Sequence, residues 1–487
     1  MSERLRSSPD DGFNHILLSD VHLGSDIIPH LRPWASTSWL LKEHEIDARL
    51  VGWLEHYTAQ RDEGRPWRLV IAGDFLDLAG VSIAIPEGMA TAPTDEERRH
   101  GLGSAVDHVL RKVDAIVARH ASVFRALGRF VAAGNALVFV RGNHDIELYW
   151  DEAQGALIEA ILAHEPAHEH PLLRSRIAIR PWFFAVDGLL YVEHGHEFDP
   201  LCSYGDPLSS TCVRDPRRIR WTAFSVLLRY VARPTQGLSS GSYSYASMGD
   251  YVRLLLKLGF RGSVGIAGRY LRASYLLLAE CRANTSAAAR ERARAAAAKL
   301  AQFAQGSGVS KETLENLRAL YVPPAVQRFG VMLRSLYLDR IVCALLGTFG
   351  LLAAAPFVPQ LGVISAVSIL LVTSGLIGYA LVGSGDNCSP QTTMLQSAAQ
   401  IAQLFSARWV VMGHTHEPTI QAVSSTANYV NLGSWGEDDP PDERTVPRNP
   451  LGTFLVVRKH ADDFLAELMH WDERRGPSVI GQKTPRV

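Results

Sequence analysis

Short apolar runs alternate with longer amphipathic stretches along the first 200 residues. Apolar runs of four to six residues bounded by polar ones predict strands, whereas apolar positions three or four apart predict helices. The elements expected from this pattern are strands at 15–19, 68–72 and 136–141 and within 177–193, and helices at 38–60, 104–132 and 153–164. The alternation of strands and helices predicts an α/β fold built in layers.

The alternation stops near residue 200 and resumes near residue 386. Residues 201–340 have the pattern of a helical insertion, which includes an Ala- and Arg-rich helix at 286–305. The resumed pattern predicts a helix at 391–406, a strand at 408–412 and closing strands at 427–433, 452–458 and 463–469. We therefore expect one layered domain formed by residues 1–200 and 386–471, with a flexible tail at 472–487.

Residues 341–385 contain no charged side chain. Pro356 and Pro359 divide this run into two halves, each near the roughly 20 residues that cross a bilayer core. We therefore expect a transmembrane helical hairpin that turns at residues 356–360; the alternative is a helical hairpin buried in a soluble core. Arg334 and Arg340 predict that its ends lie on the cytoplasmic side of the inner membrane, with the catalytic domain facing the cytoplasm.

Charge is distributed unevenly along the chain, although the whole sequence has a formal charge of −1. Residues 207–340 hold 21 Lys and Arg against 7 Asp and Glu, a net charge of +14. Such a basic segment indicates an anionic partner, either nucleic acid or lipid headgroups, and the expected hairpin favours the lipid bilayer. Residues 217–233 combine apolar side chains with five arginines. They predict either an amphipathic helix in the membrane interface or a helix packed on the catalytic domain with its arginines in water.

The five cysteines are scattered and form no CxxC pair. This spacing indicates neither a disulfide framework nor a cysteine-based zinc site, and it favours a reducing compartment. The first fifteen residues lack the apolar stretch of a secretory signal.

Five short polar motifs follow apolar runs in a fixed order. They are Asp20-Val21-His22, Gly73-Asp74, Gly142-Asn143-His144-Asp145, His194-Gly195-His196 and Gly413-His414-Thr415-His416. Because each motif follows a predicted strand, its side chains should meet at one sheet edge. Carboxylate, amide and imidazole ligands in this number suit two adjacent divalent cations, which together can bind a phosphate and activate water.

These motifs, in the context SDVHLG, AGDFLDL, RGNHD, EHGHEFD and MGHTHEP, resemble the signature of the calcineurin-like metallophosphoesterases. The resemblance covers roughly 1–200 and 390–470. It implies a four-layer α-β-β-α sandwich with a two-metal site, in which manganese is the expected ion and iron and zinc are alternatives. The ligands it implies are Asp20, His22 and His416 for one metal, Asn143, His194 and His414 for the other, and Asp74 as the bridge between them.

The resemblance also implies catalytic roles in the GNHD motif. His144, beside the ligand Asn143, would be the general acid or a hydrogen-bond donor to the leaving oxygen, and Asp145 would orient its ring. His196 is expected to support a ligand or face the substrate. Arg141 is expected to touch the substrate phosphate or to lie at the surface.

Other acidic residues of the motifs have less specific expected roles. Asp77 should cap or pack near the Gly73-Asp74 turn. Glu193, Glu197 and Asp199 are expected either to support the ligand histidines through hydrogen bonds or to be polar loop residues.

Part of the pattern is similar to the UDP-2,3-diacylglucosamine pyrophosphohydrolases, which share the DxHL opening and GHTHxP. This chain departs from them at His144, where they carry Arg, and at His194-Gly195-His196, where they carry HGD. The function expected from the sequence is a membrane-anchored phosphoesterase. It would cleave a phosphate ester or pyrophosphate bond of a lipid- or nucleotide-linked substrate with a metal-activated hydroxide. The alternatives are a nuclease or cyclic-nucleotide phosphodiesterase, and a membrane scaffold with a vestigial metal site.

Overall fold

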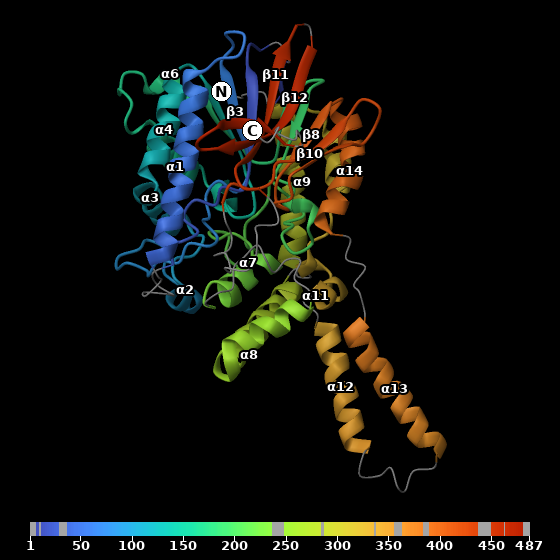
Figure 1. The fold of residues 1–487 in the computed structure, drawn as a ribbon. Helices are drawn as coiled ribbons and strands as arrows, with labels where there is room; N and C mark the ends of the chain where they lie inside the picture. Colours follow the sequence, from blue (N-terminus) through green and yellow to red (C-terminus); the bar gives the residue numbers. More distant parts are fainter. Residues whose placement is uncertain are drawn as a thin grey trace.

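The computed structural model covers the 487-residue chain, and most of it is described here (Figure 1). The described residues are 6–8, 11–28, 37–235, 248–283, 287–335, 338–354, 363–382, 389–436, 450–461 and 463–480.

A seven-stranded mixed sheet carries the first three motifs. Its strand order is β13-β12-β11-β2-β3-β4-β5. The strands are β2 (Asn14–Leu18), β3 (Trp67–Ala72), β4 (Ala136–Val140), β5 (Ile177–Arg180), β11 (Thr453–His460), β12 (Asp463–Asp472) and β13 (Gly476–Val479). Strands β2 to β5 are parallel neighbours, so the loops that follow β2, β3 and β4 leave the sheet at one edge.

A six-stranded mixed sheet carries the last two motifs. Its strand order is β1-β6-β7-β8-β10-β9. The strands are β1 (Arg6–Ser7), β6 (Phe184–Val186), β7 (Leu190–Val192), β8 (Trp409–Met412), β9 (Thr419–Ala422) and β10 (Asn428–Asn431). Strand β7 pairs with β8 in parallel, although more than 200 residues separate them, and this pairing places the two histidine motifs side by side.

The helices fall into an outer layer on each sheet and an insertion. They are α1 (Thr37–Ala59), α2 (Asp95–His100), α3 (Val106–Arg119), α4 (Ala121–Ala132), α5 (Asp151–Leu162), α6 (His170–Arg174), α7 (Ala223–Leu227), α8 (Met248–Ala283), α9 (Ala287–Ser307), α10 (Lys311–Ala319), α11 (Phe329–Ser335), α12 (Leu338–Ala354), α13 (Val363–Val382) and α14 (Pro390–Phe405). Short 3-10 segments lie at Ile146–Tyr149, His196–Phe198 and Ala325–Gln327, and one π-helical turn at Leu228–Ala232.

Three hydrophobic cores define the layers. One core joins the seven-stranded sheet to α1, α3, α4 and α5, and a second lies between the sheets, where Val70 and Val140 share a cluster with Val192 and Val411. The third core joins the six-stranded sheet to α14, with contributions from Leu300 of the insertion. The layers therefore run helices, sheet, sheet, helices, and the α/β class expected from the sequence is confirmed.

The basic segment 217–233 differs from both interpretations of its pattern. Only residues 223–232 are helical, and Arg220 and Arg229 are 4 % and 5 % exposed. Arg229 donates to the Glu96 carboxylate at 2.6 Å, and Arg218 makes two 2.8 Å hydrogen bonds to the carboxylate of Glu97. Most of these arginines therefore hold the insertion on the catalytic domain, because a bidentate guanidinium–carboxylate pair fixes two surfaces in one orientation.

The uncharged segment forms two helices that lie side by side and project away from the sandwich (Figure 1). Helix α12 has 17 residues, which span about 26 Å at 1.5 Å per residue and fall short of a ~30 Å hydrocarbon core. Across the described ranges, no helix is both long enough and apolar enough to cross a membrane. The expected transmembrane hairpin is therefore not found among these residues, and its expected turn at 356–360 lies outside them.

Two smaller expectations also change. The stretch 104–132 forms two helices, α3 and α4, that meet at His120. Residues 476–479, expected to belong to a flexible tail, form β13, which pairs with β12 in antiparallel register. The four cysteines in the described part of the chain are free thiols.

Candidate metal centre

The motif side chains converge because each motif sits at the end of a buried strand. Asp20 and His22 follow β2, Asp74 follows β3, and Asn143 follows β4. His194 follows β7, and His414 and His416 follow β8. Most of these side chains are buried, whereas those of His414 and His416 are partly exposed. The facing edges of the two sheets thus assemble one cluster from residues nearly 400 positions apart.

The backbone of this cluster is strained. Asp20, His22, Asp74, His414 and His416 all have φ between 52° and 69°. Non-glycine residues seldom adopt this left-handed conformation, which costs about 1–3 kcal/mol each and persists where surrounding structure enforces it. Five such residues at the ends of three strands indicate a site selected for side-chain placement rather than for stability.

Two motif glycines leave the space that these side chains occupy. Gly73 has φ +88°, and a Cβ there would lie 2.5 Å from the ring of His194. A Cβ on Gly142 would overlap the carboxylate of Asp74. Only glycine therefore allows the backbone of one motif to approach the polar side chain of another so closely.

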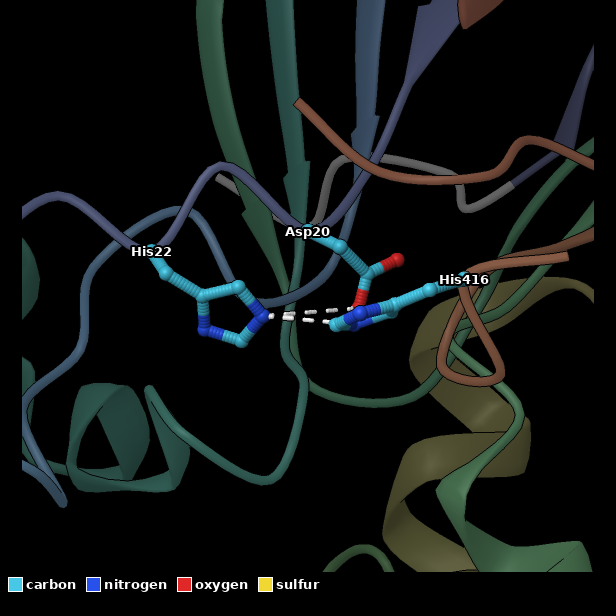
Figure 2. A group of neighbouring side chains, drawn as sticks. All are labelled: Asp20, His22 and His416. Atoms are coloured by element: carbon cyan, nitrogen blue, oxygen red, sulfur yellow. Dashed lines mark hydrogen bonds and ion pairs between the residues drawn. The ribbon is translucent and has the colours of Figure 1, made fainter. Parts of the chain in front are cut away.

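The first group of possible ligands contains Asp20, His22 and His416 (Figure 2). His416 Nε2 lies 3.1 Å from Asp20 Oδ1, and His22 Nε2 lies 3.5 Å from His416 Nε2 and 3.8 Å from Asp20 Oδ1. Three donor atoms therefore face one small volume, as the predicted first metal site requires.

A second group surrounds Asp74. His194 Nε2 lies 3.1 Å from Asp74 Oδ2 and 3.0 Å from Asn143 Oδ1. Its other ring nitrogen, Nδ1, donates to the Ala72 carbonyl at 2.8 Å, which fixes the tautomer and leaves Nε2 as the ligand atom. Asp20, Asp74 and His194 also form one group of possible ligands, so the two groups share Asp20 and are contiguous.

The electrostatics of the cluster favour positive charge. Burial favours the neutral form of the Asp74 carboxyl, yet the neighbouring His194 and His144 hold its pKa well below the usual range. Burial opposes charging of His194 as well, but the carboxylates of Asp74 and Asp20 raise its pKa to about 9. A buried volume that draws protons onto imidazole so strongly is suited to divalent cations, which replace those protons as the positive partner.

His414 lies next to Asp199, one of the acidic residues expected to support a ligand histidine. Its Nε2 lies 3.2 Å from Asp199 Oδ2, and its backbone N–H donates to Asp20 Oδ2 at 3.0 Å. Asp199, Cys202 and His414 form a further group of possible ligands. The Asp199 contact fits the expected support of a ligand histidine, whereas nothing in the spacing of the cysteines pointed to Cys202.

The ring of His144 is held by Asp77, not by Asp145 as expected. His144 Nδ1 lies 2.7 Å from Asp77 Oδ1, while the two oxygens of Asp145 accept the backbone N–H groups of Gly142 and Phe75 at 2.6 and 2.9 Å. Asp145 thus shapes the loop and Asp77 orients the imidazole. Arg233, from the insertion, donates to the other oxygen of Asp77.

The ring of His144 packs against the ligand His22 and against a ring of the insertion. Its centroid is 4.4 Å from that of His22 and 5.1 Å from that of Phe224 on α7. His22, Asp74 and His144 form a group of possible ligands of their own. The insertion therefore covers the side of the site on which this imidazole lies.

His196 lies beside the ligand His194, and Arg141 is buried. The His196 ring is 5.4 Å from that of His194, and its Nε2 is 3.6 Å from Glu197 Oε1. Arg141 is 3 % exposed, so the surface role considered for it is wrong.

The residues present fit two divalent cations: buried carboxylate, amide and imidazole donors converge on contiguous volumes, with the tautomer of at least one histidine set for coordination. No model of a known protein family matches this chain, and the chain matches no curated protein. The chain is an α/β protein of two mixed sheets with buried His and Asp groups that could bind metal.

Proposed function

We propose that this protein is a metal-dependent phosphoesterase of the calcineurin-like type. The observation that carries the proposal is that Asp20, His22 and Asp74 lie close together. Any two of these three residues occur together in one group of possible metal ligands. Two adjacent divalent cations bound there would clamp a phosphate and lower the pKa of bound water, the chemistry by which such sites hydrolyse phosphate esters and pyrophosphates.

The chain's own residues have separable roles in this proposal. Asp20, His22 and His416 would hold one cation, Asn143, His194 and His414 would hold the other, and the Asp74 carboxylate would be shared between them. His144 donates a proton or hydrogen bond to the leaving oxygen through Nε2, because Nδ1 is bonded to Asp77. We propose that both cations are manganese, with iron or zinc as alternatives.

The test is Mn²⁺-dependent hydrolysis of p-nitrophenyl phosphate and bis(p-nitrophenyl) phosphate by the purified full chain, with bound metal measured by mass spectrometry. Asp74→Ala should lose both metal and turnover, because it removes the bridging carboxylate. Asp187→Ala, which changes an exposed carboxylate, should lose neither. Turnover retained by Asp74→Ala would refute the proposed function.

We further propose that the enzyme works at the surface of an anionic bilayer, on the cytoplasmic side of the inner membrane. Helices α12 and α13 expose large apolar side chains by 47–71 %: Val342, Leu345, Leu346, Phe349, Leu352, Val367, Leu370, Leu371 and Val372. An exposed apolar patch of this extent marks an interaction site, and burial in the acyl region would stabilise each side chain by up to about 1.5–3 kcal/mol. Arg334 and Arg340 at the start of the hairpin would meet anionic headgroups.

Flotation with liposomes containing phosphatidylglycerol tests this partner. The double substitution Leu345→Asp/Phe349→Asp should abolish flotation, whereas Ile420→Asp/Leu465→Asp, which changes exposed apolar residues of the sandwich, should not. Equal flotation of the two variants would contradict the assignment of the bilayer to this hairpin.

A further inference from the structure

Three cationic side chains lie near two tyrosine rings, one of which is close to His196. Arg141 follows β4 and lies two positions before the ligand Asn143, whereas Arg220 and Lys299 come from the insertion. We call these three residues the cation cluster.

Two tyrosines link the members of the cation cluster. The Arg141 guanidinium carbon lies 5.6 Å and Lys299 Nζ 5.2 Å from the centre of the Tyr149 ring, and the Arg220 guanidinium carbon lies 5.8 Å from that of Tyr204. Both tyrosines belong to one small hydrophobic cluster. The Tyr204 ring in turn lies 6.1 Å from that of His196, which adjoins His194. The cation cluster therefore extends from the neighbourhood of His196, through Tyr204, towards Tyr149 and Lys299, which are partly exposed.

The two arginines of the cation cluster have more N–H donors than hydrogen bonds within the protein. Arg141 and Arg220 are 3 % and 4 % exposed, and a guanidinium carries five N–H donors. Yet among the described residues each donates one hydrogen bond, to the carbonyl oxygen of Pro207 and of Tyr204 respectively. Lys299 donates to the Tyr149 hydroxyl at 2.7 Å and lies 3.5 Å from the Leu208 carbonyl.

Carboxylate partners are also missing. Within the described ranges no carboxylate oxygen lies within 4.0 Å of any of the three cations. Carboxylates act on the two arginines from farther away: Asp145 and Glu197 on Arg141, and Glu197, Glu280 and Asp206 on Arg220. Glu197 accepts from Ser203 and Gly205, and Asp145 accepts from two backbone N–H groups.

Buried charges in proteins are normally paired, because an unpaired charge loses its hydration without compensation. A ligand anion would supply the missing partner. Guanidinium and ammonium groups together are the side chains that bind phosphoryl oxygens best, the guanidinium in a bidentate manner.

We propose that the cation cluster binds a second phosphoryl group of the substrate, next to the phosphoryl group held at the metal centre. The substrate class is then a pyrophosphate, in which the two groups share one bridging oxygen, rather than a simple monoester. This inference rests on the proposed function and narrows it. Hydrolysis would break the bond between one phosphorus and the bridging oxygen, with water supplying the new oxygen and its protons.

The test compares methylenediphosphonate, which has two anionic groups and cannot be hydrolysed, with methylphosphonate, which has one. Affinities for the manganese-loaded full chain are measured by calorimetry and as inhibition of p-nitrophenyl phosphate hydrolysis. Lys299→Gln and Arg220→Gln each remove one charge of the cation cluster. Arg294→Gln removes an exposed charge from the same helix as Lys299 and is the matched control.

The expected result is that Lys299→Gln and Arg220→Gln each weaken binding of the diphosphonate about tenfold, the effect of losing one charge-assisted contact, while affinity for methylphosphonate stays within about twofold. Arg294→Gln should change neither affinity. Because Lys299 is partly exposed, its substitution tests the proposal even if Arg220→Gln fails to fold. Unchanged diphosphonate binding in Lys299→Gln, or equal loss for both probes, would overturn the subsite while leaving the phosphoesterase in place. Turnover in Asp74→Ala would instead overturn the proposed function.

Discussion

Substitution of Asp77 by Asn tests whether the hydrogen bond between His144 and Asp77 assists the leaving group. His144 Nδ1 and Asp77 Oδ1 are 2.7 Å apart, and their side chains are 6 % and 1 % exposed. Asparagine keeps the size of the side chain but removes the charge that fixes the imidazole and stabilises its protonated form. General acid–base catalysis contributes about 10²–10⁴-fold, so we expect a loss of about 100-fold, or ~2.7 kcal/mol in the barrier, for esters with poor leaving groups.

The leaving group distinguishes this role from a structural one. p-Nitrophenolate leaves without protonation, so Asp77→Asn should lower kcat for p-nitrophenyl phosphate by less than about fivefold. Methyl or other alkyl phosphates should show the full loss. The assay is kcat for a series of phosphate monoesters of rising leaving-group pKa, with bound manganese measured in each variant.

A second buried histidine–aspartate pair provides the control. His120 Nδ1 also lies 2.7 Å from a carboxylate, that of Asp47 on α1, and His120 itself lies at the junction of α3 and α4. Its Nε2 accepts the backbone N–H of Gly24 at 3.0 Å, so this pair supports a loop but does not orient the His144 ring. Asp47→Asn should therefore cost stability without changing how rate depends on the leaving group. A uniform loss across all esters in Asp77→Asn, or the same slope in both variants, would refute the reasoning.

Two further substitutions test the site and its link to the insertion. Gly73→Ala should reduce bound metal and lower the free energy of unfolding by at least ~1–2 kcal/mol, because the φ of Gly73 is +88° and a Cβ there would meet the His194 ring. Gly155→Ala is the control, because a Cβ at Gly155 would lie in open space. Metal content and thermal melting check this prediction, and an unchanged metal content in Gly73→Ala would contradict it. Tyr321→Phe should lower the free energy of unfolding, measured by chemical denaturation, by about 1–3 kcal/mol, because the Tyr321 hydroxyl donates at 2.7 Å to the buried carboxylate of Glu193. An unchanged free energy of unfolding would show that this hydrogen bond does not hold the insertion in place.

The strands of the sandwich were readable from the sequence because each is a short apolar run closed by a polar motif. The predicted strand at 68–72 corresponds to β3 (Trp67–Ala72), and that at 136–141 to β4 (Ala136–Val140). A strand buried on both faces carries its signal locally, so its position does not depend on its neighbours. The order of strands in the sheets, and the pairing of β7 with β8, required the tertiary structure.

The insertion was predicted less well because its pattern is ambiguous. An apolar segment with arginines is compatible with a membrane interface, with water or with a protein surface. The choice depends on whether acidic side chains such as Glu96 and Glu97 lie opposite, and these come from helix α2, more than 100 residues earlier. Charge counts along the chain cannot distinguish an arginine that faces solvent from one that is neutralised inside the molecule.

The sequence by itself determined the residues that meet at the sheet edge, since motif and strand are adjacent in the chain and the strand's direction carries the motif with it. Only the tertiary structure decided which partner each residue has. Asp77, 67 positions from His144, holds its ring, although Asp145 is the next residue, and Arg233, 156 positions from Asp77, completes the chain of contacts. The physical reason is that a hydrogen bond depends on distance and direction in space: Asp145 follows the turn and points at backbone N–H groups, whereas Asp77 is brought opposite the imidazole by the pairing of β3 with β4.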